Sequence, residues 1–293
     1  MMHTCTQRQY HNTYFFFVVR KTRSTIESEE IESIRVPVRN KKSPTGFSVE
    51  TYPILHPHRI ISFLMDHVQI NVCKAEVAEY WQHARRMGEQ WAVNHPSPGD
   101  HIPLGLHGDS ARLWTQCTFE KYTAISFNIL HFRPKSVRYS RFVVFSIPTA
   151  KLFKNRTLNS VWRRLAWSFE ALYQGTYPQT GVGGAPLTDH NLKFAGLPIT
   201  KSGQRFALCE FRGDWEWHCS MWRPTASWQS INICFKCPAV AAGESAELLY
   251  WNIKEPCGWH QQEFGLEQFL ARRLKDTNLC ILPHVFSPAF YFE

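Results

Sequence analysis

The chain contains no apolar run long enough to span a membrane. Crossing a bilayer takes about 20 consecutive apolar residues. The longest candidate near the N-terminus, residues 15–19, is a short Phe/Val stretch with no basic leader before it, unlike a signal peptide. Charged residues make up 19% of the chain and aromatic residues 14%, and only 15 residues are glycine. This composition excludes collagen, a coiled coil and a disordered chain, and it indicates a protein that does not cross a membrane.

Cysteine pairs suited to a disulfide framework are also lacking. The 293 residues include nine cysteines, a sparse and odd number that is not typical of a disulfide scaffold. We therefore expect a reducing, intracellular compartment. The length predicts about two domains, or one domain with insertions, and it is ample for a buried core.

Acidic residues are missing from one long segment, residues 121–169. The rest of the chain has 23 basic and 24 acidic residues, so this segment carries the whole basic excess of a chain with net charge +9. Aromatic residues lie between its cations, which favours binding to a phosphate backbone with stackable bases. The alternative is a solvated basic face over core aromatics. After Lys121, the candidate nucleic-acid contacts are Arg133, Lys135, Arg138, Arg141, Lys151, Lys154, Arg156, Arg163 and Arg164.

Hydrophobic periodicity predicts two helices followed by an α/β core. A break rich in Pro and Gly at 94–100 separates the two parts. The elements expected from periodicity and punctuation are helices at 60–68 and 75–93, strands at 102–107, 123–130 and 141–147, a helix at 158–174 ended by Gly175, and a strand at 205–211.

Three strands, a helix and a fourth strand form the opening of an RNase H-like fold. We therefore expect an α/β protein with an RNase H-like mixed-sheet core, a helical N-terminal region and a C-terminal zinc knuckle. The expected divisions are a flexible leader at 1–46, the helical region at 47–99, the core at 100–232, and the knuckle with a helical extension at 233–293.

Two aspartates follow glycines at the expected ends of the first and fourth strands. Asp109 and Asp214 would meet if those strands are neighbours. Close carboxylates repel each other and favour a divalent cation between them, and paired Mg²⁺ or Mn²⁺ ions are the usual clamp for phosphoryl displacement. The alternative is that each Gly-Asp pair is a plain turn. His107 could support such a metal site or simply hydrogen-bond a neighbour.

The order of three short motifs resembles a group of eukaryotic transposases. These motifs are Leu-Gly-Leu-His-Gly-Asp at 104–109, Arg-Gly-Asp-Trp at 212–215 and Cys-Phe-Lys-Cys-Pro at 234–238. They are similar to those of the Plavaka-like (Kyakuja–Dileera–Zisupton) DDE transposases, and closer still to multicopy transposon-like proteins of dinoflagellates. The resemblance covers about residues 53–293. It implies the first half of a DDE domain, nuclear DNA as partner, and Asp109 and Asp214 as catalytic metal ligands.

The chain departs from the transposase pattern in two respects. The family's third carboxylate lies on a helix beyond a Leu-Pro loop like that at 282–283, and the chain ends at Glu293, so a C-terminally truncated copy is expected. Glu263 and Glu267 are the available acids on an expected helix at 260–275. The second departure is that Trp-Glu, rather than the family's Tyr-Pro, follows Asp214.

Paired cysteines indicate a structural zinc site. Cys234 and Cys237 are followed, after nineteen residues, by Cys257 and His260. This spacing suits tetrahedral Zn²⁺, and thiolate ligands favour zinc over magnesium or calcium. The alternatives are that His218 or Cys219 replaces one ligand, that the cysteine pair is an unmetallated turn, or that it is a redox motif.

The sequence thus favours a transposase-like protein for metal-dependent DNA strand cleavage or transfer. It would be an incomplete or degenerate copy, and it could form a homo-oligomer. The alternative is a non-catalytic, zinc-stabilised domain of transposon origin that binds nucleic acid or a protein partner. A complete set of three carboxylates would favour the enzyme, and its absence the binding domain.

Overall fold

The fold is built around a four-stranded mixed sheet. The computed structural model describes residues 31–93, 95, 101–112, 121–136, 139–214, 217, 230–234, 237–253, 258 and 259. The strands of the sheet are β3 (His101–Arg112), β4 (Lys121–Ile129), β5 (Phe142–Pro148) and β6 (Arg205–Arg212). Each lies within a few residues of the position expected from the sequence. Burial alternates with period two along β4, whereas residues 101–108 of β3 and 206–209 of β6 are buried continuously.

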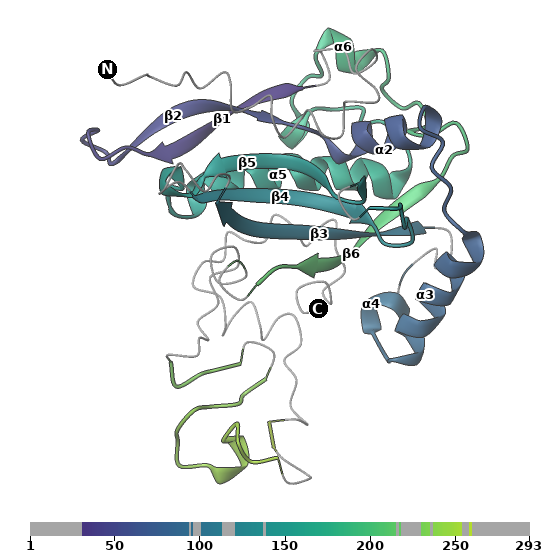
Figure 1. Ribbon diagram of the computed structural model, residues 1–293. Helices are drawn as coiled ribbons and strands as arrows, with labels where there is room; N and C mark the ends of the chain where they lie inside the picture. The colour runs from purple at the N-terminus through teal and green to yellow at the C-terminus, as the bar shows by residue number, and fades with distance from the viewer. Residues whose placement is uncertain are drawn as a thin grey trace.

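The order of the strands in the sheet is β5-β4-β3-β6. β3 pairs antiparallel with β4, and β4 pairs antiparallel with β5. β6 runs parallel to β3, which requires a long crossover connection. The crossover includes a short 3₁₀ turn, η3 (Thr149–Lys151), and the long helix α5 (Lys154–Gln174) (Figure 1).

The two faces of the sheet differ in polarity. On β4, Thr123, Ile125, Phe127 and Ile129 are buried, whereas the residues between them are only half-buried. The ring of Phe127 meets Phe169 of α5 edge to face, with centroids 6.3 Å apart, so α5 covers the apolar face. On β4 the opposite face is lined by alternate, more polar residues and is the more open one.

α5 begins one turn earlier than expected and ends where expected. Its N-cap is Phe153, whose backbone N–H donates to Thr157 Oγ1 at 2.9 Å, so the Thr157 hydroxyl acts from inside the first turn. Gly175 ends the helix with φ of 76°, a conformation that glycine adopts without strain. The chain then passes through η4 (Val182–Gly184) and α6 (Asp189–Leu192) before β6.

A separate two-stranded hairpin precedes the helices. β1 (Glu32–Arg39) pairs antiparallel with β2 (Phe47–Ile54). Val38 forms a bridge with Leu152, and the Leu55 N–H donates to the Val144 carbonyl at 2.9 Å. Residues 31–46 had been assigned to a flexible leader, and the strand at 47–54 to a helical region. They are ordered because alternate apolar residues of β1 are buried against α5. The Phe/Val stretch at 15–19 lies outside the described residues.

Three helices link the hairpin to the main sheet. They are α2 (Pro57–Asp66), α3 (Lys74–Arg86) and α4 (Gln90–Val93). The sequence predicted one helix over 75–93, and the break comes at Gly88, which has φ of 79°. The indole N–H of Trp81 donates to the His101 carbonyl at 2.8 Å, which ties α3 to the start of β3.

Among the described helices, none combines the length and apolar character needed to cross a bilayer. The helices together with the mixed sheet make this an α/β fold, as expected.

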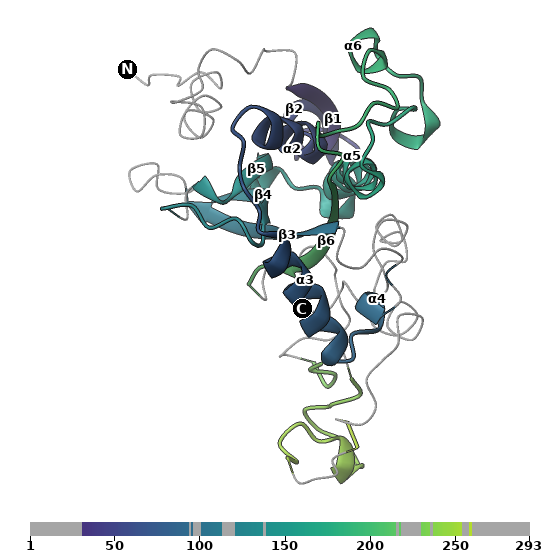
Figure 2. The same ribbon diagram turned by 90° about the vertical axis from the view of Figure 1, so that its right-hand side faces the viewer.

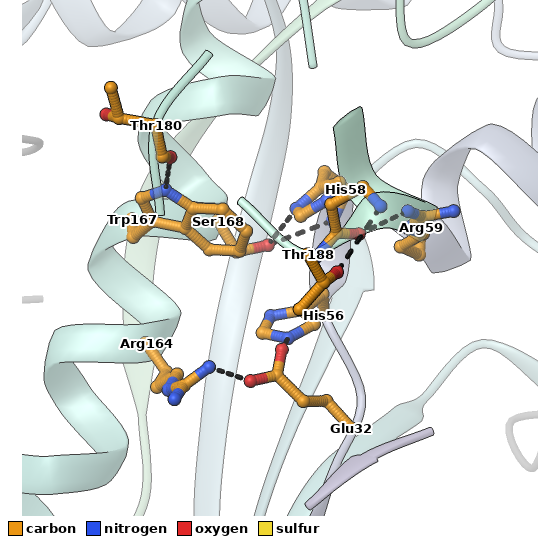
Figure 3. Close-up of polar contacts among 10 residues, drawn as sticks. Glu32, His56, His58, Arg59, Arg164, Trp167, Ser168, Thr180 and Thr188 are labelled. Atoms are coloured by element: carbon orange, nitrogen blue, oxygen red, sulfur yellow. Dashed lines mark hydrogen bonds and ion pairs between the residues drawn. The ribbon is translucent and has the colours of Figure 1, made fainter. Parts of the chain in front are cut away.

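Two buried histidines join α2 to α5 and β1 (Figure 3). His58 bonds through its backbone N–H and its Nδ1 to Ser168 Oγ, at 3.1 and 2.8 Å. His56 Nε2 lies 2.6 Å from a Glu32 carboxylate oxygen, and Glu32 also pairs with Arg164. Burial, reinforced by the Arg59 charge, lowers the pKa of His56 to about 4, and burial lowers the pKa of His58 well below its usual value.

These histidines predict a loss of stability in mild acid. Between about pH 6.5 and pH 4, the unfolded chain binds protons that the folded chain does not. The free energy of unfolding should therefore fall with decreasing pH by up to about 1.4 kcal/mol per pH unit for each histidine. Urea unfolding at several pH values measures this slope. Replacing His58 by Asn should make the slope shallower, whereas His83→Asn, at an exposed position of α3, should leave it unchanged.

Candidate functional site

The two aspartates predicted from the sequence lie at the same edge of the main sheet. The last pair in the parallel β3–β6 ladder joins His107 to Arg212. Along each strand a glycine and then an aspartate follow, so Asp109 and Asp214 leave neighbouring strands at matching positions. Both side chains are exposed. The structure therefore brings the two carboxylates to one exposed edge, as the order of strands required.

One detail of the expectation was wrong, because β3 does not end at Gly108. It continues to Arg112 and stays paired with β4 from Leu104–Ile129 to Arg112–Lys121. Antiparallel pairing with a long partner strand outweighs the preference of Gly-Asp for turns. Asp109 therefore lies within a paired strand, where pairing with Ala124 of β4 orders its backbone.

The glycine before each aspartate makes room for the ring of Trp217. A Cβ added at Gly108 would lie 1.5 Å from Trp217 Cε2, and one at Gly213 would lie 2.6 Å from Trp217 Cε3. The same added atom at Gly213 would lie 3.0 Å from the Gly108 carbonyl oxygen. The two backbones therefore touch beneath one indole that is only 2% exposed. Any side chain at Gly108 would displace this ring.

Trp217 is also bonded to the second aspartate. Its backbone N–H donates to Asp214 Oδ1 at 2.6 Å, the bond of a carboxylate that caps the residue three positions later. This bond holds one oxygen of Asp214 in place. Trp217 itself is a buried core residue. Its role at the aspartates was missed, although an acid three residues before a buried tryptophan was the available signal.

His107 is held by an asparagine of the neighbouring strand. Its Nε2 lies 2.7 Å from Asn128 Oδ1, and Gly105 leaves the space for this amide, since a Cβ there would lie 2.7 Å from the same oxygen. Burial lowers the pKa of His107, opposed by the Asn128 bond and reinforced by the charges of Arg141 and Arg212. The ring is therefore neutral at pH 7, and its Nε2–H donates to Asn128.

Arginines give the open face of the sheet positive charge. Arg212 is exposed and pairs with Glu210. It and Arg141 both act on His107, which places these cations around the strand that carries Asp109. Glu210 offsets part of the charge of Arg212, so a phosphate group near this edge would meet these two cations together with three carboxylates.

The basic segment at 121–169 does not form one continuous surface. Lys151 and Arg164 form partly exposed ion pairs with Glu50 and Glu32 of the β1–β2 hairpin. Arg133 and Lys135 follow the end of β4 that pairs with Leu104, away from Asp109. The remaining described candidates are Arg141 at the start of β5, and Arg156 and Arg163 on the exposed side of α5. Arg138 and the side chain of Lys154 lie outside the described residues.

Half of the expected zinc site can be described. Cys237 is buried and Cys234 is half-buried, on a segment closed by a bridge between Asn232 and Val240. Cys257, His260, His218 and Cys219 lie outside the described residues, as do Glu263 and Glu267. In the part of the chain that the structure describes, no three His, Cys, Asp or Glu side chains are grouped to hold a metal.

The chain matches no protein-family model, no curated protein and no solved structure with which it was compared.

Gly108→Ala tests whether the Trp217 ring holds the two strand ends together. The new methyl group would force the indole out of its buried position, so we expect the free energy of unfolding to fall by about 3 kcal/mol. Urea denaturation measures this change. The control is Gly243→Ala, where an added Cβ would meet only Val240 Cγ2 at 3.5 Å; it should change stability by less than about 0.5 kcal/mol. Equal, small effects of both substitutions would contradict this packing.

Proposed function

We propose that the chain is a transposase-like protein in which Asp109 and Asp214 carry metal-dependent cleavage or transfer of DNA strands. The observation that carries this proposal is the parallel register of β3 with β6, whose last pair, His107–Arg212, lies two residues before Asp109 and Asp214. An antiparallel β3-β4-β5 meander, a helical crossover and a fourth strand beside the first are also what an RNase H-like core would have.

The donor set at this edge fits Mg²⁺ or Mn²⁺. Mg²⁺ is commonly held by one or two carboxylates while it keeps several waters and binds phosphate oxygens. Asp109 and Asp214 are exposed, and the Trp217 N–H engages only one oxygen of Asp214. A bound Mg²⁺ or Mn²⁺ would activate a water or a DNA 3′-hydroxyl and offset charge on the phosphate.

The residues around the carboxylates have supporting roles in this proposal. Trp217 keeps the ends of β3 and β6 in contact, which fixes the separation of the two acids. Arg141 and Arg212 attract the phosphodiester to the open face. His107 donates a hydrogen bond from its Nε2–H to Asn128 Oδ1, and this bond orients the strand that carries Asp109.

Asp109→Asn should abolish metal-dependent nicking and leave DNA binding intact. Loss of one carboxylate ligand removes several kcal/mol of charge stabilisation, so nicking of supercoiled plasmid in Mg²⁺ or Mn²⁺ should fall at least about a hundredfold. A second readout is the Mn²⁺-dependent rise in the thermal unfolding midpoint, which the variant should lose. The control is Asp189→Asn, an exposed residue on the first turn of α6. Nicking that survives in the Asp109 variant would overturn this assignment.

A second candidate function is non-catalytic binding of nucleic acid. It is favoured by the lack of a third carboxylate grouped with Asp109 and Asp214 among the described residues. The same experiment separates the two functions. DNA binding by the wild-type chain with no metal-dependent nicking would support the binding domain.

The zinc knuckle remains part of the proposal. The residues between Cys257 and His260 pack beside the segment that follows the first cysteine pair, since Gly258 lies against Glu247 and the Trp259 indole N–H donates to the Asn252 carbonyl at 3.2 Å. That segment in turn bonds to Val240. The two halves of the predicted ligand set are therefore joined through described contacts, which supports a shared Zn²⁺.

Cys234→Ser and Cys237→Ser should each remove tight zinc binding. The wild-type chain should retain about one Zn²⁺ and show the absorption of a tetrahedral thiolate complex when Co²⁺ replaces it. Cys73→Ser, at an exposed cysteine, is the matched control and should keep both properties. Zinc binding that persists in the Cys237 variant would contradict the knuckle.

A further inference from the structure

The hairpin β1–β2 carries a set of exposed cations that the fold does not neutralise. Arg35 and Arg39 lie on the exposed side of β1, and Lys41 and Lys42 lie on the connecting loop. The chain has no acidic residue between positions 35 and 49. No ion pair found among the described residues involves any of these four side chains. We call them, together with Arg156 of α5, the cationic hairpin.

The loop that carries the lysines is held in shape by its own hydrogen bonds. The Asn40 N–H donates to the Gly46 carbonyl at 2.9 Å, and the Gly46 N–H donates to the Ser43 carbonyl at 2.9 Å. The Lys42 N–H also donates to Asn40 Oδ1 at 3.0 Å. Because the backbone is already ordered, binding here costs less conformational entropy than binding by a free loop.

An aromatic pair attaches the hairpin tip to α5 and holds another cation there. Phe47, the register partner of Arg39, stacks on Phe153 with centroids 5.1 Å apart. The Arg156 guanidinium lies 5.6 Å from the Phe47 ring and 5.7 Å from the Phe153 ring. Arg156 is exposed, so it extends the charge of the hairpin onto the start of α5.

The hairpin tip lies at the same end of the molecule as the aspartates. Ser110, next to Asp109, bonds to Thr123, and Thr123 bonds to Thr149 of η3, each through hydroxyl groups 3.0 Å apart. The chain leaves η3 at Leu152, which forms a bridge with Val38 of β1. Figure 1 shows the hairpin loop, the end of β5 and the end of β3 on the left side of the fold, and Figure 2 shows β1 and β2 above the sheet, on the side of α5.

We propose that the cationic hairpin binds the phosphate backbone of duplex DNA beside the aspartate edge. Arg35 and Arg39 are four residues apart, or about 13 Å along an extended strand, which is the axial rise of about four phosphates on one DNA strand. Apart from Pro44, the loop between the strands is polar, and it has no large apolar side chain to insert into a bilayer, so DNA fits better than a membrane surface. The DNA partner rests on the proposed function, but binding by the hairpin does not require catalysis.

The test compares two triple variants with equal loss of charge. The first combines Arg39→Gln, Lys41→Gln and Lys42→Gln. The control combines Arg85→Gln, Arg86→Gln and Lys201→Gln, which are exposed positions on α3 and before β6. Fluorescence anisotropy with a labelled duplex, in the absence of divalent metal, gives the affinity of each at several salt concentrations. Circular dichroism and the urea midpoint confirm that each variant is folded.

The hairpin variant should bind DNA at least about tenfold more weakly, and the slope of log affinity against log salt should become shallower by about 2 to 3. The control variant should stay close to the wild type. An equal loss in both variants, or no loss in the hairpin variant, would overturn the proposal. A larger loss of binding to phosphatidylserine vesicles than to DNA would replace DNA by a membrane surface.

The outcome is separable from that for Asp109. If the hairpin variant loses DNA binding while the wild-type chain never nicks DNA, only the catalytic proposal fails. If the wild-type chain nicks DNA in a manner that requires Asp109 and the hairpin variant binds and nicks normally, only the hairpin proposal fails.

Discussion

β3 and β6 lie side by side and run in the same direction, an arrangement that the chain reaches only through the crossover helix α5. The parallel pairing requires that the apolar face of the sheet be covered, and α5 covers it. The same pairing brings the two Gly-Asp sequences to one edge. The Trp217 ring then lies across Gly108 and Gly213, so the two strands stay in contact beyond their last ladder pair. The position of each aspartate depends on this contact.

The Leu-Gly-Leu-His-Gly-Asp motif at 104–109 is explained by the side chains that pack against β3. Gly105 leaves space for the Asn128 amide, and His107 bonds to that amide. Gly108, on the next position, leaves space for the ring of Trp217. Each of these glycines therefore makes room for a neighbouring side chain and does not form a turn. Asp109 is the first residue of the motif whose side chain is exposed, and it is free to act on a partner outside the fold.

The cations of the chain have different roles once it is folded. Lys151 and Arg164 are adjacent in the basic segment to exposed cations, yet both pair with glutamates of the hairpin. Arg39 and Lys41, which belong to a short basic patch in the expected leader, are exposed and face no acid in the described ion pairs. The hairpin thus supplies the acids that neutralise part of α5 and presents its own cations at the tip. A count of charges along the chain could not separate these two groups, because the pairing joins residues about 100 or more positions apart.

Local pattern was sufficient for the main sheet and its crossover helix. Period-two alternation in β4 and a helical stripe ended by Gly175 are properties of neighbouring residues, so the sequence by itself determined these elements and the pair of aspartates. It could not show that β3 passes through Asp109, because that depends on pairing with β4. The tertiary structure alone decided that residues 32–54 form a hairpin, that Asn128 and Trp217 hold the aspartate edge, and which cations stay exposed. Each of these rests on contacts between segments distant in the chain, which no local pattern encodes.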